Sequence, residues 1–313
     1  MSQHPDGTSG AGPVAPGRPP GPAGVIHDIG YRRYDGPRLG RPYAVRTLFL
    51  DSLRSAYGLG RTAKSKVLPF LLLAVMAVPA AVMVAVTIVI GLTELPVHYT
   101  AYAMVLPPIV GLYVAAQAPQ LFSRDLRYRT ITLYLSRPFE RLDYVVAKSA
   151  ALAAAIAILQ LLPLLVLYGG ALLAELPLRR ETEGFLQGLA VAIVLSLVLT
   201  GLGGLLAAVT TRRGLGVAAI IGLLSVSYGA VNAVAGFAAS EGNDTAATYA
   251  GLFSPFTLVD GLQAWVFGAG GPSSAVPAPE GALAGGLYVL TTVVVLAGSF
   301  GLLVLRYLKA ART

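Results

Sequence analysis

Long apolar stretches, separated by short polar segments, dominate the chain after residue 66. Six of these stretches approach the ~20 residues that a helix needs to cross about 30 Å of hydrocarbon. They cover residues 67–91, 101–122, 145–169, 184–209, 215–238 and 282–305. The pattern predicts an all-α integral membrane protein with six transmembrane helices. Prolines inside these stretches are compatible with spans, because neighbouring helices can bind the backbone groups that a proline frees.

A seventh apolar stretch, residues 249–267, precedes the last of the six. It carries Ser254, Pro255 and Asp260 among its apolar and aromatic residues, and a Gly/Pro-rich run follows it. A seventh span would move the basic C-terminal tail to the outer side of the membrane. We therefore expect an outer re-entrant or interfacial segment here, with its aromatic side chains near headgroup depth.

An amphipathic helix is predicted over residues 43–57, before the first span. Apolar residues such as Leu48 and Leu53 recur at helical spacing, and Arg46 and Arg54 lie on the opposite side. We expect this helix to lie in the inner membrane interface, with its basic face toward anionic lipid. The alternative is a helix that packs on another cytoplasmic protein.

Three regions follow from these patterns. Half of residues 1–24 are glycine or proline, which predicts a disordered tail because such a segment cannot bury a core. Residues 25–66 form a cytoplasmic N-terminal segment with the amphipathic helix. Residues 67–313 form the six-span membrane domain.

Composition agrees with a membrane protein and excludes several other classes. The 313 residues are 55% hydrophobic and only 12% charged, with a mean hydropathy of +0.70. A soluble domain carries about 25% charged residues. The composition therefore excludes a soluble enzyme and a disordered protein. Because the chain has no cysteine, it also excludes a disulfide-stapled scaffold and thiolate chemistry.

The basic residues indicate the orientation of the spans. With the N-terminus inside, all of the 23 Lys and Arg residues except Arg179 and Arg180 fall on the inner side. Such a bias follows the positive-inside rule and predicts a multi-pass protein of the plasma membrane with both termini in the cytoplasm. It also explains the net charge of +8 without any nucleic-acid partner.

Motifs for catalysis are weak. The segment GLGRTAKS at 58–65 differs from a phosphate-binding P-loop at Ala63, and it lacks the preceding strand that a P-loop needs. The three histidines are far apart and predict no metal site. None of the six spans has an ionisable residue near its centre, whereas ion-coupled carriers place such groups there. We therefore expect no catalytic residue, metal or cofactor, and an energy source outside this chain.

A polar stripe on the fifth predicted span is a candidate path lining. Ser225, Tyr228 and Asn232 fall on one helix face. They are candidates to line a substrate path, or to form hydrogen bonds between helices that hold the bundle together. Tyr113 and Gln117 on the second span are equally ambiguous, and Gly184 with Gly188 forms one GxxxG packing signal.

The segment between the second and third spans carries the most specific signal. It is charged, but it also holds apolar residues such as Ile131 and Leu135 that a fully solvated loop would not need. They indicate a docking surface on the inner side.

Two segments resemble a known family. LYLSRPFERLDYVVAK at 133–148 is similar to the loop between spans two and three of ABC-type-2 exporter permeases. HDIGYRRYDGPRLGR at 27–41 is similar to the N-terminal motif of one bacterial branch of that family. The predicted spans, inner amphipathic helix and outer re-entrant segment also fit. The resemblance covers about residues 25–313.

The resemblance implies a membrane subunit that pairs with a second permease, identical or homologous, and docks two cytosolic ABC ATPase subunits. The positions that match the family's ATPase-docking region are Asp125, Leu135, Ser136, Arg137, Pro138 and Arg141. The positions that match the N-terminal motif, whose role stays open, are Tyr31, Arg32, Tyr34, Gly36 and Arg38.

The expected function is thus an ATP-driven exporter subunit without an ATPase site of its own, in contact with membrane lipid. The substrate is not defined. An ion-coupled carrier or channel is the first alternative, and a membrane assembly subunit without transport is the second.

Overall fold

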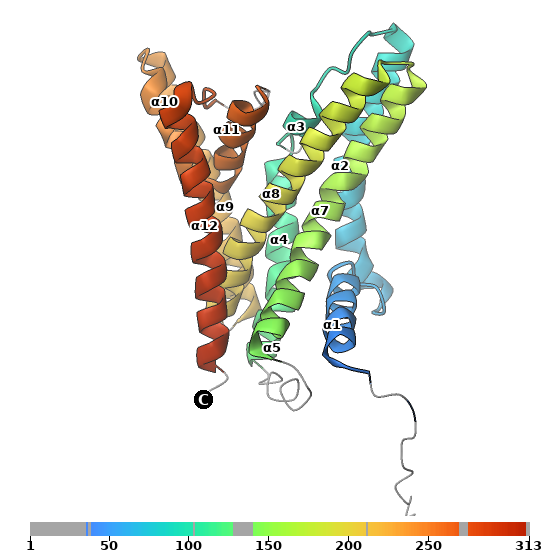
Figure 1. Ribbon diagram of the computed structural model, residues 1–313, viewed down its shortest axis with the longest axis vertical. Coiled ribbons are helices and arrows are strands. Elements are labelled where there is room, and N and C mark those ends of the chain that lie inside the picture. Colours follow the sequence, from blue (N-terminus) through green and yellow to red (C-terminus); the bar gives the residue numbers. More distant parts are fainter. Residues whose placement is uncertain are drawn as a thin grey trace, which may run out of the picture. The chain divides into compact units, whose positions relative to one another are not determined.

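The computed structural model describes residue 36 and residues 39–102, 104–127, 140–210, 212–268 and 275–310, without the side chains of Arg141 and Ala310. The described residues from 39 onward form one compact unit, to which the helices of Figure 1 belong. Of the described residues, 84% are helical and none is in a strand. The prediction of an all-α protein is therefore confirmed for this part of the chain.

Five helices are long and apolar enough to cross a membrane, which indicates a multi-pass membrane protein. They are α2 (Ala63–Ile90), α7 (Arg141–Leu173), α8 (Leu178–Val209), α9 (Arg213–Ser240) and α12 (Gly281–Ala310). These helices cover five of the six predicted spans. In the most apolar part of α7 and of α8, more than half of the residues are buried. In α2, α9 and α12 less than a quarter of the corresponding residues are. Helices α7 and α8 therefore lie at the centre, and α2, α9 and α12 leave much of their apolar surface exposed.

The second predicted span differs from a single helix. Residues 101–122 are divided between α3 (Tyr99–Tyr102) and α4 (Pro107–Leu121), with a turn between them. Pro107 and Pro108 cause the break, because proline lacks the N–H that would continue the helix and disfavours helical backbone at the preceding residue. The 15 residues of α4 span only about 22 Å.

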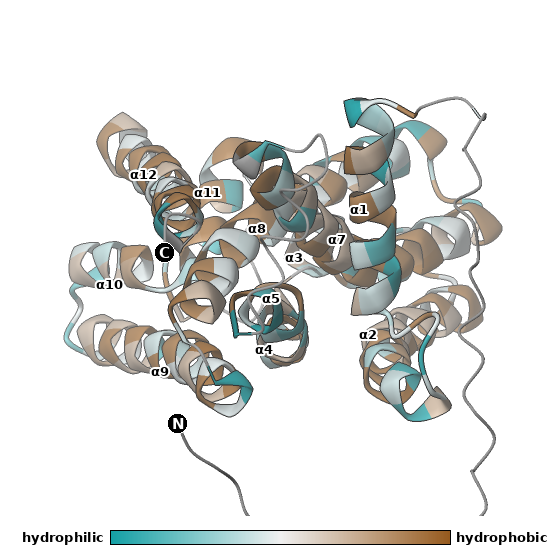
Figure 2. Ribbon diagram, turned by 90° about the horizontal axis from the view of Figure 1, so that it is seen from below, coloured by the Kyte–Doolittle hydropathy of each residue, from teal (hydrophilic) through white to brown (hydrophobic). Residues whose placement is uncertain are grey.

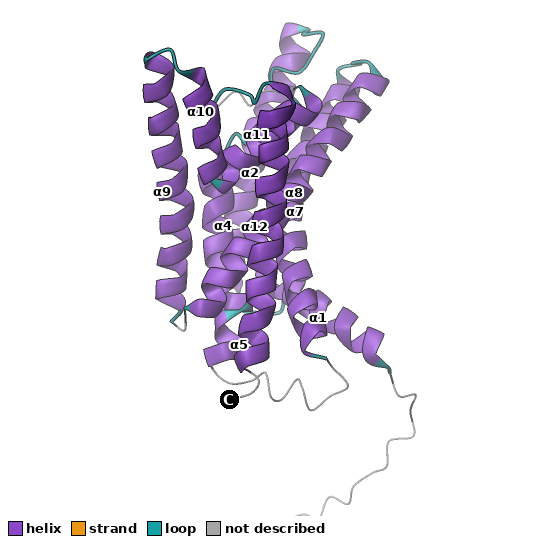
Figure 3. Ribbon diagram, turned by 60° about the vertical axis from the view of Figure 1, so that its left-hand side comes forward, coloured by secondary structure: helices purple, strands orange, loops and turns teal. Residues whose placement is uncertain are grey.

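The apolar stretch 249–267 is also not one long helix. It is divided between α10 (Asp244–Ala250), a 3-10 turn (Gly251–Phe253) and α11 (Pro255–Phe267). The side chain of Thr257 donates a hydrogen bond to the carbonyl of Gly251 (2.7 Å) and thereby stabilises the corner. Helix α11 packs against α8, α9 and α12. Figure 3 shows α10 and α11 beside the end of α9 and the start of α12.

The predicted amphipathic helix is α1 (Arg41–Ala56), and its buried residues are Leu48, Ser52 and Ala56. These residues form the face of α1 that packs against α7. The apolar face of α1 is thus partly covered by α7 of the same chain, which neither the expected membrane-interface position nor the alternative of packing on another protein included. Arg46 and Arg54 on the other side are exposed.

We call the end of the unit that holds α1, α5 (Ser123–Arg127) and the last turn of α12 the basic end (Figure 1). Arg124, Arg213 and Lys309 lie there, whereas Arg179 and Arg180 begin α8 at the opposite end. Figure 2, which views the unit from the basic end, shows α4 and α5 between α9 and α2. Two sets of basic residues that the sequence analysis assigned to different sides of the membrane thus lie at opposite ends.

Candidate functional site

The candidate site surrounds the two ends of the segment between α5 and α7. Its predicted docking residues Leu135, Ser136, Arg137 and Pro138 lie outside the described residues, as does the side chain of Arg141. Asp125 is described, and so is Glu140, the N-cap residue directly before α7. The structure therefore shows how this segment is anchored on both sides.

Asp125 forms the first anchor. Its carboxylate accepts hydrogen bonds from the Lys148 ammonium group and from the Tyr144 hydroxyl, both on α7. Lys148 is 5% exposed and also donates to the carbonyl of Leu121 (2.8 Å). A buried ammonium group needs such partners, because removing it from water costs several kcal/mol. We call this group the Asp125–Lys148 anchor.

The Asp125–Lys148 anchor also reaches α12. The ring of Tyr307 lies 5.6 Å from the ring of Tyr144, centroid to centroid, and its hydroxyl donates to the carbonyl of Phe122 (3.1 Å). Helices α5, α7 and α12 are thus tied together at one point. The sequence analysis selected Asp125 but missed Lys148, Tyr144 and Tyr307. The spacing of Tyr144 and Lys148, one helical turn apart, was the signal that could have placed both on one face.

Arg41 forms the second anchor. Its guanidinium donates two hydrogen bonds to the carboxylate of Asp143 (2.7 and 2.8 Å) and pairs with Glu140. These hydrogen bonds, first to Asp143 and then to Glu140, raise the pKa of Arg41, which therefore stays charged. Glu140 and Asp143 also cap the start of α7 through reciprocal side-chain hydrogen bonds. We call this group the Arg41 anchor.

The Arg41 anchor joins the two segments that carry the family resemblance. Arg41 is the last residue of the motif at 27–41, and Glu140 and Asp143 belong to the motif at 133–148. Of the other N-terminal motif positions, Gly36 lies at a bend, and Tyr31, Arg32, Tyr34 and Arg38 lie outside the described residues. Two motifs about 100 residues apart in sequence thus meet at the start of α7.

A third contact holds the other end of α1. The hydroxyl of Tyr57, directly after α1, donates to the carbonyl of Ala155 on α7 (2.8 Å). Burial raises the pKa of Tyr57 to about 12, so the hydroxyl stays protonated and able to donate. Helix α1 is therefore fixed to α7 at both of its ends.

The candidate path-lining residues separate into two groups. Ser225 and Tyr228 line an apolar groove of about 400 Å³ between α4, α9 and α11, where the Tyr228 ring meets Phe256 edge to face. Asn232 does not line this groove. Its amide donates to the carbonyl of Tyr228 (2.8 Å) and accepts from the backbone N–H of Ala275 (3.3 Å), so it connects α9 to the segment before α12.

A buried contact that the sequence analysis missed joins α3 to α8. The hydroxyl of Tyr99 donates to the carboxylate of Glu181 (2.8 Å), and both residues are buried. Tyr99 lies against Gly184 and Gly188: a Cβ added at Gly184 would come within 2.8 Å of the Tyr99 ring, and one added at Gly188 within 2.8 Å of the Tyr99 Cβ. The GxxxG signal therefore corresponds to packing inside this chain.

The segment 58–65 that is similar to a P-loop joins α1 to α2. Residues 58–62 form a turn and residues 63–65 begin α2, where the Ser65 hydroxyl donates to the carbonyl of the N-cap residue Thr62 (2.7 Å). A P-loop instead follows a strand. Among the described residues, no group of three His, Asp or Glu side chains is placed to hold a metal ion.

Neither protein-family models nor curated proteins give a match to this sequence. The proposed function therefore depends on the residues and geometry of this chain.

Proposed function

We propose that this chain is the membrane-spanning permease subunit of an ATP-binding-cassette exporter. It binds no ATP itself. Cytosolic ATPase subunits dock on the segment between α5 and α7, and a second permease, identical or homologous, completes the substrate path.

The observation that carries this proposal is the Arg41 anchor. Two segments resemble two separate motifs of one permease family, and their ends are held together by Arg41, Glu140 and Asp143. Independent chance resemblances would have no reason to meet in space. Their contact at the start of α7 supports a shared role at one site.

The anchors suggest how docking would be coupled to the spans. A force on the segment between α5 and α7 would reach α1 through the Arg41 anchor, and α5 and α12 through the Asp125–Lys148 anchor. Helix α7 would transmit it along its 33 residues to α2 and α8. ATP in the partner subunits would then favour one of two arrangements of these helices.

The proposed topology has six spans and both termini in the cytoplasm. The second span consists of α3 and α4 together, and α10 and α11 form an outer re-entrant hairpin before α12. The separation of basic residues between the two ends supports this orientation. Irregular backbone is compatible with membrane depth where protein surrounds it, as at Tyr102 and Pro107, which are buried.

Co-purification tests the proposal. The tagged full chain, extracted in mild detergent, should carry a cytosolic ATPase subunit, and the complex should hydrolyse ATP. Arg41→Gln should reduce this association or the transport that accompanies hydrolysis, whereas Arg46→Gln, which removes an exposed charge from the same helix, should not.

Each alternative gives a different result. Flux by the purified chain in vesicles without an ATPase subunit would indicate a carrier or channel. Co-purification of membrane proteins only, with neither flux nor ATP hydrolysis, would indicate an assembly subunit. Either result would overturn the proposal.

A further inference from the structure

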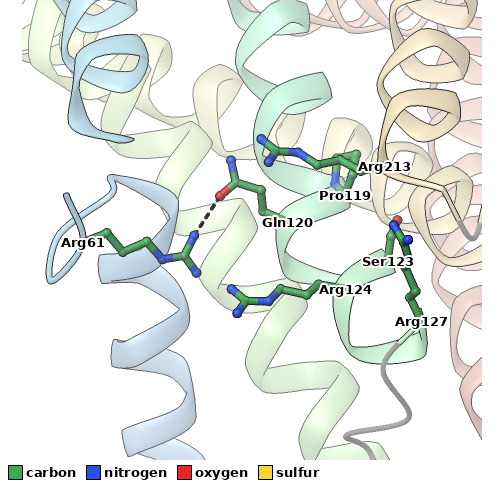
Figure 4. A pocket seen from close by; sticks show the side chains of 7 residues that line it. All are labelled: Arg61, Pro119, Gln120, Ser123, Arg124, Arg127 and Arg213. Carbon is green, nitrogen blue, oxygen red and sulfur yellow. Dashed lines mark hydrogen bonds between the residues drawn. The ribbon is translucent and has the colours of Figure 1, made fainter. Parts of the chain in front are cut away.

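Four arginines line a cleft at the basic end. Arg61 precedes α2, Arg124 and Arg127 are on α5, and Arg213 begins α9. The cleft has a volume of about 320 Å³, and no acidic residue is among the described residues that line it. Figure 4 shows the guanidinium groups of Arg61 and Arg124 pointing toward each other across the cleft. Like charges that converge in this way favour an anion between them.

Neutral groups hold this arrangement in place. Gln120 accepts a hydrogen bond from Arg61 (3.1 Å) and donates one to the carbonyl of Ala116 (3.2 Å), so it directs Arg61 into the cleft (Figure 4). Ser123 is buried and donates to the carbonyl of Ala207 (2.5 Å). Gln120 and Ser123 therefore tie the wall of the cleft to the packed helices.

The N-terminus of α9 adds a second positive contribution. Its N-cap residue Arg212 makes no capping hydrogen bond with its side chain. The first turn of α9 lies against the cleft, since a Cβ on Gly216 would come within 3.3 Å of the Pro119 ring. The amide groups of a helix N-terminus favour phosphate and other anions.

Two acidic residues lie near but do not cancel these charges. Asp51 and Asp125 line an adjoining cleft that shares Arg61 and Arg124. Asp125 is bound to Lys148 and Tyr144, and Asp51 is an exposed residue of α1. Counting Lys148, five positive groups line the two clefts together with two negative ones.

The apolar groove that Ser225 and Tyr228 line lies along the same pair of helices as the arginine cleft. Helices α4 and α9 pack against each other, and Leu112 and Ile221 line the groove between them. On each helix the groove and the cleft are about eight positions apart, as from Leu112 to Gln120 and from Arg213 to Ile221, which corresponds to about 12 Å. We call the surface between these two helices the α4–α9 seam. It thus has a candidate anion site at the basic end and an apolar site about 12 Å farther along the helices.

We propose that the seam between α4 and α9 binds one anionic phospholipid, with its phosphate in the arginine cleft and an acyl chain in the apolar groove. Basic pockets between membrane helices on the inner side are suited to anionic headgroups, and arginine binds phosphate with paired N–H donors. A soluble phosphate compound would use the cleft but not the groove. This site goes beyond the proposed transport function and needs no ATPase partner.

Lipid titration of the purified, delipidated full chain tests this proposal. Native mass spectrometry would measure binding of phosphatidylglycerol, phosphatidylcholine and glycerol 3-phosphate. We expect phosphatidylglycerol to bind the most tightly. The triple variant Arg61→Gln/Arg124→Gln/Arg213→Gln should lower its affinity by at least about tenfold. The control Arg46→Gln/Arg54→Gln/Lys309→Gln removes the same charge from exposed positions outside the cleft, including the basic face of α1, and should lower the affinity much less than the cleft variant does.

A groove variant tests the acyl-chain site separately. Gly229 lines the groove, and an added Cβ there would meet no atom within 4 Å, so Gly229→Phe should fold and fill the groove. It should weaken phosphatidylglycerol binding without altering the weak binding of glycerol 3-phosphate.

Four results would overturn the proposal. One is an equal loss of affinity in the triple variant and its control, which would indicate general charge attraction. Another is binding of glycerol 3-phosphate as tight as that of the lipid. A third is full lipid affinity in Gly229→Phe. The last is a triple variant that keeps lipid affinity but loses a cytosolic protein partner, which would assign the arginines to protein docking.

Discussion

Lys148 and Asp125 are 23 positions apart in the chain, and the close contact between them makes each acceptable in a protein interior. Lys148→Met would leave the Asp125 carboxylate in a half-buried site with one strong donor fewer. We expect a loss of roughly 3 kcal/mol in the free energy of unfolding, since removing one member of a buried pair is much more costly than removing both. Thermal unfolding in detergent measures the change.

The double variant Asp125→Asn/Lys148→Met provides the control for that prediction. It removes both charges, so it should recover a large part of the lost stability. Equal destabilisation in the single and the double variants would show that the ion pair is not what holds α5 to α7.

Residues 135 and 137 carry the prediction for ATPase docking. Leu135→Asp and Arg137→Ala should weaken ATPase association or uncouple hydrolysis from transport, because contact residues that fill a partner's pocket often contribute about 2 kcal/mol or more. Membrane insertion should be unchanged. Normal association and transport in both variants would exclude this segment as the docking site.

Arg137→Lys separates recognition from charge. Lysine keeps the positive charge but loses the planar guanidinium with its paired donors. A defect in Arg137→Lys would indicate a specific contact. Normal behaviour would leave Arg137 as one more contributor to the inner positive charge.

Lys64 tests the segment that is similar to a P-loop. Because the segment joins two helices, Lys64→Ala should leave ATP hydrolysis by the assembled complex intact and affect membrane or lipid interaction at most. Steady-state hydrolysis by the purified complex is the measurement. A loss as severe as that caused by mutating a P-loop lysine in the ATPase subunit would contradict this prediction.

At the scale of elements, α3 depends on a close approach to α8. A Cβ at Gly188 would lie 2.8 Å from the Cβ of Tyr99 and 3.0 Å from its backbone, so α3 would have to shift. Gly188→Ala should therefore lower the free energy of unfolding by about 1–3 kcal/mol. Calorimetry or thermal unfolding in detergent would measure it.

Gly222→Ala on α9 is the matched control. An added Cβ there would meet no atom within 4 Å, and alanine is favoured over glycine inside a helix by about 1 kcal/mol. A glycine-to-alanine change should thus stabilise α9 slightly at position 222 but destabilise the contact between α3 and α8 at position 188. Equal effects at the two positions would show that helix propensity, and not packing, controls the result.

At the scale of the whole molecule, the topology is open to direct test in this cysteine-free chain. Single cysteines at Gly60, Arg212 and Ala310 should be protected from a membrane-impermeant label in intact cells. Cysteines at Leu178 and Ala275 should react. The reason is the positive-inside rule, applied to basic residues that lie at opposite ends of the helical unit. Reaction at Ala310 would place the C-terminus outside and make 249–267 a crossing segment.

The sequence by itself was sufficient for the class of fold. Each of α2, α7, α8, α9 and α12 corresponds to an apolar stretch, and α1 lies within two residues of its predicted bounds. These features depend on composition and periodicity over about 20 neighbouring residues, which any sequence contains in full. The same holds for the division of basic residues between the two ends.

Tertiary structure decided which residues meet. It placed Lys148 on Asp125, Arg41 on Glu140 and Asp143, and Tyr99 in the space beside Gly184 and Gly188. It also removed Asn232 from the groove that Ser225 and Tyr228 line. Such contacts depend on the rotation and tilt of each helix, which are set by the packing of all its neighbours together. Hydropathy along the chain contains no information on these angles, and so the anchors and the α4–α9 seam emerged only from the packed helices.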